Sequence, residues 1–425
     1  MAETPSPPPS PYAPGIISEE RTPPRPAGRP VVLLVASFVL ILVTTPSFWW
    51  QWAWCSTPVD GHARSMMDLF IRVPPGAANV LILASAYVSD RVALWGTRRE
   101  GYLLLCGLTM TITWVVLAVV GTGDVVWVLA VVEFSVIGSV LRAAVVGGLA
   151  EIGQRRAATG RLSAGFLVAN QVAFLAATPL AAVFTIAPGP LMAGIAAGLS
   201  AAIVILITTV TDDGARAPEG PAIAPFKIWQ FLRSRTFWSV VCVGCIAGLA
   251  TVPRELIVSH LWATHSDTMT ETSGRLRWIE GAVEIAAALG YLFVCRRAPL
   301  RRVLRISLFA NALVLIAFER TLKWGGLDVA AAAVAASHGI VIIAILDLVL
   351  RAAPRGREAF GAILLGSLPM SVAYLLSYFA ARVEAKAAGM AWFAAAAAIA
   401  GGLAVSLLPR ALVATRDGWR VEGTQ

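Results

Sequence analysis

Long apolar runs alternate with short polar stretches along almost the whole chain. Twelve of these runs reach the roughly 20 residues that a helix needs to cross the hydrocarbon core of a membrane. The pattern therefore predicts an all-α membrane protein with twelve transmembrane helices. We expect these at residues 31–52, 66–89, 101–121, 125–149, 162–186, 188–210, 236–259, 275–295, 301–319, 327–350, 358–381 and 387–408.

The longest polar connection on the predicted inner side follows the sixth run and divides the chain into two parts. This linker, 212–235, separates a first six-helix half, 31–211, from a second, 236–408. Residues 1–30 hold ten prolines with Ser, Glu and Arg, a composition that buries too little apolar surface to fold, so we expect a disordered cytoplasmic tail. Residues 409–425 form a second predicted cytoplasmic tail.

Composition and charge agree with this layout. With 57% hydrophobic and 14% charged residues, the chain has too little polar surface for one large soluble domain. The tails and the even-numbered loops hold 25 of the 34 Lys and Arg, with Arg142 included in that count. Cytoplasmic loops are enriched in these residues, so both termini are predicted to be cytoplasmic in a multi-pass protein of the plasma (inner) membrane. No nucleic-acid-binding motif accompanies the net charge of +9.

The loop after the second run carries an unusual set of charges. An acid and a base, Asp90 and Arg91, are followed by Gly96 and by the pair Arg98 and Arg99. This arrangement resembles the major facilitator superfamily signature between helices 2 and 3, and the six-plus-six layout is that of the same superfamily. The resemblance implies two related halves that rock about a substrate site near the membrane midplane.

Two further segments narrow the resemblance. The longer form of the loop, S-D-x-x-x-x-x-G-x-R-R-x-x-Y-L, resembles the folate-biopterin transporter branch. So do Leu289-Gly290-Tyr291 with Pro299-Leu300-Arg301, and the segment from Pro354 through Arg355, Arg357 and Glu358 to Ser367. The sequence departs from the branch at Ala353, where Cys is common, and at Pro369, near its usual Asn. Muropeptide and acetyl-CoA permeases have a similar loop, so these alternatives stay open.

The charged loop predicts a conformational latch. Asp90 ends the second run on the same face where the eleventh run begins, after Arg355 and Arg357. A carboxylate is favoured beside a helix N-terminus, and an Arg adds a charge-assisted bond. We expect Asp90 to contact Arg355, Arg357 or the start of that helix when the cytoplasmic side is closed. The latch set also includes Arg91, Gly96, Arg98, Arg99 and Glu358.

Acids inside the predicted spans are candidates for proton coupling, because a charge in the bilayer core costs roughly 2.5–3.5 kcal/mol. Glu133 lies near the middle of the fourth span, with a structural hydrogen bond to a neighbouring helix as the alternative role. Glu280 and Glu284 lie four residues apart and share one face of the eighth span. Glu284 is the deeper of the two, and Glu280 is an interfacial anchor if the span begins later.

Other polar residues of the spans are candidates for binding the solute. Arg254 closes the seventh span and is suited either to an anionic group or to a salt bridge with Glu255 or Asp68. Asn170 and Gln171 lie midway along the fifth span and His338 midway along the tenth. Polar side chains at such depths also join helices without touching substrate, so both roles remain open.

The sequence as a whole predicts a secondary-active transporter for a small organic solute, with protons as the coupling ion. It contains no nucleophile-base pair and no metal-ligand spacing that would indicate an enzyme, and we expect no cofactor and no metal. The expected partners are the solute, protons and the lipid bilayer, and the expected state is a monomer. A non-transporting membrane assembly or scaffold role within the same superfamily is the alternative.

Overall fold

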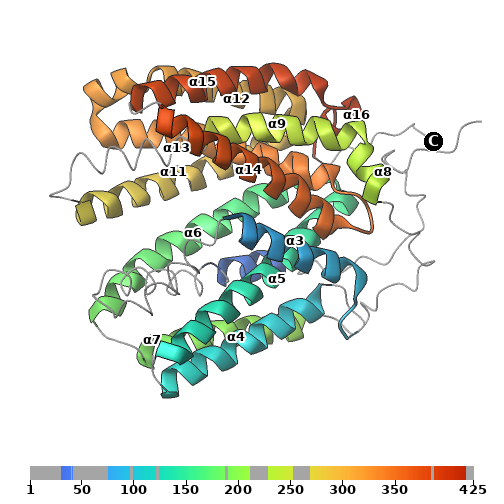
Figure 1. The fold of residues 1–425 in the computed structure, drawn as a ribbon, viewed down its shortest axis with the longest axis vertical. Helices are drawn as coiled ribbons and strands as arrows, with labels where there is room; N and C mark the ends of the chain where they lie inside the picture. The colour runs from blue at the N-terminus through green and yellow to red at the C-terminus, as the bar shows by residue number, and fades with distance from the viewer. Residues whose placement is uncertain are drawn as a thin grey trace, which may run out of the picture.

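The computed structural model describes residues 30–39, 41, 75–95, 99–120, 124–186, 190–210, 228–251, 269–383 and 387–417. Each of the twelve predicted spans overlaps a helix in these ranges (Figure 1). The helices of the first half are Pro30–Val39, α3 (Pro75–Arg91), α4 (Glu100–Val120), α5 (Asp124–Arg156), α6 (Thr159–Ile186) and α7 (Pro190–Val210). Those of the second half are α9 (Arg235–Thr251), α11 (Met269–Arg297), α12 (Leu300–Ile316), α13 (Phe318–Ala352), α14 (Glu358–Val383) and α15 (Ala387–Ala404).

Proline marks several helix starts. Pro75 and Pro190 are the first residues of α3 and α7, and Pro299 and Pro409 directly precede α12 and the short α16 (Arg410–Val413). Proline lacks the N–H that the first turn of a helix leaves unpaired, and its fixed φ suits the first helical position. The apolar runs therefore begin as helices where the sequence places these residues.

Helices of one half pack mainly on each other, and a smaller set joins the halves. In the first half α4 packs on α7 and α3 on α5; in the second half α12 packs on α15, α14 on α9 and α11 on α13. The second-half helices lie together in the upper part of Figure 1. Between the halves, α6 packs on α11 and α13, and α14 packs on α3 and α5. The interface is thus built twice from equivalent helices.

Length and apolar character fit a membrane environment. Among the described residues, four helices are long and apolar enough to cross a membrane: Glu100–Val120, Val136–Arg156, Trp278–Arg297 and Gly326–Ala352. Five shorter apolar helices accompany them. Large apolar side chains remain exposed on peripheral helices, such as Ile112 and Val119 on α4 and Ile306 and Leu313 on α12. The chain is a multi-pass integral membrane protein whose exposed apolar surface suits lipid.

Several helices of the described residues differ from the hydropathy pattern. The helix α5 continues past the predicted end at residue 149 to Arg156, where Glu151 and Arg155 form an i,i+4 ion pair at 3.0 Å. The helix α13 begins at Phe318, and its non-helical Gly326 separates a first stretch from the span predicted at 327. The short α8 (Ile228–Arg233) lies within the predicted linker, whereas residues 1–29 and 211–227 lie outside the described residues.

Candidate functional site

The structure brings three of the predicted site residues together around one carboxylate. Glu284 on α11 is almost fully buried, with 3% of its surface exposed. His338 on α13 places Nδ1 3.2 Å from Glu284 Oε1. Gln171 on α6 donates a hydrogen bond from Nε2 to Glu284 Oε2. Because α6 belongs to the first half and the other two helices to the second, this carboxylate connects the halves.

The cluster lies deep in the helix bundle. Gln171 is twelve residues from the start of α6, Glu284 thirteen from the end of α11, and His338 fourteen from the end of α13. At 1.5 Å per residue these are depths of roughly 18–21 Å from the helix ends that are predicted to face the cytoplasm. A membrane core is about 30 Å thick, so all three residues lie well inside it.

Arg142 lies at the same depth on α5 and was missed as a site residue. Arg142 was counted above with the Lys and Arg of the cytoplasmic loops, but it lies fourteen residues before the end of α5. Its side chain is exposed, although protein atoms surround it on nearly all sides. The Arg142 side chain thus lies deep in the helix bundle and keeps accessible surface there. Among the described residues, no hydrogen bond or ion pair joins it to a carboxylate. The sequence already indicated such a role for Arg142, because an Arg in the middle of an apolar run is costly to place in a membrane.

The remaining mid-depth candidates have other surroundings. Asn170 Oδ1 accepts a hydrogen bond of 2.8 Å from Ser37 Oγ, which joins α6 to the N-terminal helix. Glu280 lies one turn before Glu284 on α11 and is half-buried. Glu133 lies in α5, but its side chain is outside the described residues, as is Arg254 altogether. The roles predicted for these residues therefore stay predictions.

Asp90 meets the start of α14. Its carboxylate, with 2% of the residue exposed, accepts hydrogen bonds from the backbone N–H groups of Ala359, at 3.3 Å, and Phe360, at 2.8 Å. Arg99 forms a buried ion pair with Asp90 and also donates to Ser89 Oγ at 2.9 Å. Of the three contacts expected for Asp90, the structure thus has the one with the helix start.

The other members of the predicted latch set are distributed around this contact. Glu358 Oε2 lies 3.9 Å from Arg99 Nη2, and its Oε1 accepts a bond of 2.7 Å from the N–H of Gly356. Arg357 is buried and Arg355 exposed, both just before α14. Arg91 lies over the ring of Tyr87, with Cζ 4.3 Å from the ring centroid. Gly96 and Arg98 lie outside the described residues.

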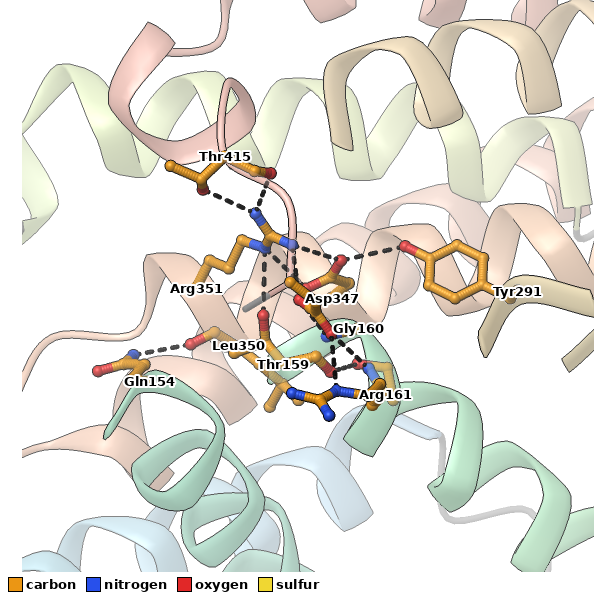
Figure 2. A network of polar contacts seen from close by, with 11 residues as sticks. Gln154, Thr159, Gly160, Arg161, Tyr291, Asp347, Leu350, Arg351 and Thr415 are labelled. Carbon is orange, nitrogen blue, oxygen red and sulfur yellow. Dashed lines mark hydrogen bonds and ion pairs between the residues drawn. The ribbon is translucent and has the colours of Figure 1, made fainter. Parts of the chain in front are cut away.

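A second polar network at the same end of the molecule was not predicted (Figure 2). Arg351, in the last turn of α13, forms an ion pair with the fully buried Asp347 at 2.8 Å. Tyr291 on α11 donates a hydrogen bond of 3.0 Å to the same carboxylate. Arg351 also donates to Thr159, the first residue of α6, at 3.1 Å. The network therefore also crosses between the halves.

Comparison with known proteins rests on solved structures. No family model and no curated protein matches the chain. The human organic anion transporter MFSD10 (TETRAN) has a similar structure, with a TM-score of 0.63 and 15% identity over 90% of this chain and 100% of that one. A bacterial homologue of the iron transporter ferroportin, in an outward-facing state, has a TM-score of 0.64 and 13% identity over 89% and 98%.

The proton:xylose symporter XylE of the major facilitator superfamily, bound to 6-bromo-6-deoxy-D-glucose, gives a TM-score of 0.53 and 12% identity over 88% of this chain and 94% of that one. This chain has the major facilitator fold. The predicted two-half, twelve-helix architecture is thereby confirmed. Identities this low show the major facilitator fold alone, so the resemblance to the folate-biopterin branch stays a prediction.

Proposed function

We propose that this protein is a secondary-active transporter that moves a small organic anion by alternating access, with protons as the coupling ion. The observation that carries the proposal is the buried Glu284, held between Gln171 of one half and His338 of the other. A carboxylate inside a membrane protein is costly to keep. Glu284 is bonded to both halves, so a change of its charge acts on both at once.

Protonation of Glu284 supplies a mechanism for coupling. The ionised carboxylate is a strong acceptor for the Gln171 amide and an ion-pair partner for a protonated His338. A proton on Glu284 removes its charge and weakens both interactions. The link between α6 and α11 then loosens, which lets the halves move relative to each other.

Arg142 supports an anionic solute. A guanidinium presents several donors in a planar fork that matches carboxylate, sulfonate and phosphate groups. Arg142 lies at the depth of Glu284, keeps accessible surface and pairs with no carboxylate among the described residues. The similar human protein is described as an organic anion transporter, which agrees with this choice of solute.

Asp90 supplies the closing device in this proposal. Its contact with the first turn of α14 joins the halves at the ends predicted to face the cytoplasm. We infer that the contact holds that side closed and separates when it opens. Separation gives up the two hydrogen bonds from the N–H groups of Ala359 and Phe360, so the latch affects how much time the protein spends in each state.

Uptake into proteoliposomes tests the proposal. A panel of labelled mono- and dicarboxylates, sulfonates and organic phosphates, with neutral and cationic analogues, is offered with and without an imposed pH gradient. We expect accumulation of at least one anion that increases with the gradient. Glu284→Gln should abolish the response to the gradient, whereas Asp328→Asn, in the exposed ion pair with Arg275 on the predicted outer side, should keep it.

The outcomes separate the alternatives. Uptake that is confined to neutral or cationic solutes would show the anion assignment to be wrong. If the protein of natural sequence takes up anions at a rate that does not depend on the pH gradient, the transport assignment holds and the proton-coupling assignment is wrong. A correctly folded protein that moves none of the panel would favour the assembly or scaffold role.

A further inference from the structure

The helices α6 and α14 begin in the same way, one in each half. Each is preceded by a residue in the left-handed region, two positions before its first residue. Ala157 has φ 48° before Thr159, and Gly356 has φ 78° before Glu358. The two helices also occupy equivalent places in the interface, since each packs on two helices of the opposite half.

Each of these starts is capped by an aspartate from elsewhere in the chain. Asp90 accepts from the second and third N–H groups of α14, at 3.3 and 2.8 Å. Asp417 accepts from the second and third N–H groups of α6, those of Gly160 at 3.3 Å and Arg161 at 2.8 Å. Both carboxylates are buried, with 2% and 6% of their residues exposed. The two caps share residue type, register and geometry.

An arginine completes each cap in the same manner. Arg99 pairs with Asp90 and approaches Glu358, the first residue of α14. Arg351 pairs with Asp417 at 3.1 Å. It also donates to Thr159, the first residue of α6 (Figure 2). Each arginine therefore joins the capping acid to the first side chain of the helix that the acid caps.

The two caps differ in the origin of the acid. Asp90 is the penultimate residue of α3, whereas the equivalent helix of the second half, α11, ends in Cys295-Arg296-Arg297. The sequence has no Asp or Glu between Glu284 and Glu319. Asp417 comes instead from the C-terminal segment, and its backbone N–H donates to Cys295 O at 3.1 Å. It thus lies beside the end of α11, where that helix offers no acid.

We infer that Asp417 is a positioning residue for transport, because it makes closure of the cytoplasmic side depend on the docked C-terminal segment. Arg351 also donates to the carbonyl oxygen and the hydroxyl of Thr415, at 2.9 and 3.0 Å, so the segment docks at more than one point. The inference rests on the alternating access of the proposed function, and it goes beyond it by adding residues 415–417 to the closing device.

Accessibility of a buried thiol tests this without a known solute. Arg142→Cys, in a background with the natural cysteines replaced by Ser, reports whether an impermeant thiol reagent reaches mid-depth from the cytoplasmic side of inside-out vesicles. We expect Asp417→Ala to increase the labelling rate roughly tenfold, a change of about 1.4 kcal/mol in the closing equilibrium. Arg416→Ala, which alters the adjacent exposed residue, should leave the rate unchanged.

A rescue variant distinguishes loss of the cap on α6 from a general loss of structure. An added Cβ at Gly160 would lie 2.9 Å from Cys295 Cβ, so the Cys295 side chain already faces the start of α6. Cys295→Asp supplies an acid from α11 itself, as Asp90 does from α3, and should restore slow labelling to Asp417→Ala. Size-exclusion profiles establish that each variant is folded.

Fast labelling of folded Asp417→Ala that slows again with Cys295→Asp supports the inference. Unchanged labelling in folded Asp417→Ala overturns it, and so does fast labelling that the added acid leaves in place. Because labelling needs no solute, a failed transport assay with a positive accessibility result would count against the proposed function and leave the role of Asp417 in place.

Discussion

At the scale of single residues, the interior of the protein holds charges that hydropathy alone would exclude. Arg142 and Glu284 lie at the same depth on α5 and α11, yet their surroundings differ. Glu284 is buried between two polar partners, whereas Arg142 keeps accessible surface. A charge that has no carboxylate partner among the described residues is suited, in that position, to a solute that binds and dissociates.

Arg142→Gln should raise the KM for an anionic solute by roughly 10- to 100-fold, because a hydrogen bond to a charged group contributes about 1.5–3 kcal/mol. Arg142→Lys keeps the charge but loses the planar fork, so it should recover part of the affinity. Arg155→Gln is the control, since Arg155 lies on the same helix in a half-exposed pair with Glu151. Initial uptake rates against solute concentration give the KM values, and equal values for Arg142→Gln and the control would contradict the assignment.

At the scale of elements, α5 and α14, which belong to opposite halves, approach each other closely at Gly147. An added Cβ at Gly147 would lie 2.6 Å from Ala359 Cβ and 2.8 Å from Arg99 Cζ, whereas one at Gly138 on the same helix would meet nothing within 4 Å. A glycine at 147 therefore allows the two helices to approach while Arg99 reaches Asp90 beside them.

Gly147→Ala should disfavour the closed cytoplasmic side and slow transport, and Gly138→Ala should do neither. Alanine favours a helix over glycine by about 1 kcal/mol, so a loss confined to Gly147→Ala must come from the contacts with Ala359 of α14 and with Arg99, which pairs with Asp90. The measurement is uptake together with thiol accessibility from the cytoplasmic side. Equal behaviour of the two variants would show that this approach does not limit closure.

The sequence predicted the positions of the helices better than the contacts between their side chains. Spanning length is a property of consecutive residues, so each of the twelve spans predicted from hydropathy overlaps a helix in the described part of the chain. It also selected Gln171, Glu284 and His338 as polar groups at depth. That these three residues meet depends on the rotation of three helices about their axes, which no single apolar run records. Asp417 was unpredictable in the same sense, because a polar tail carries no periodic pattern.

At the scale of the whole molecule, two related caps close one side from both halves. The Asp90 cap joins α3 to α14, and the Asp417 cap joins the end of α11 to α6. Gln154 adds a further connection, since its Nε2 donates to the carbonyls of Leu350 and Ala353 at 2.7 and 2.8 Å. If the halves move as rigid bodies, all these contacts form and break in one transition.

A double-mutant cycle on the two caps tests this rigid-body account. The caps share no residue, so their contributions to the free energy of closing should add. Asp90→Ala and Asp417→Ala should then each raise cytoplasmic labelling of the Arg142→Cys reporter, and the double variant should raise it by the product of the two factors.

Each single variant must leave the reporter below its maximal labelling rate, which a denatured sample defines. A double variant no faster than the faster single variant would show that one cap alone controls closure. A product relation would mean that the C-terminal segment and the end of α3 act on the same transition from opposite halves.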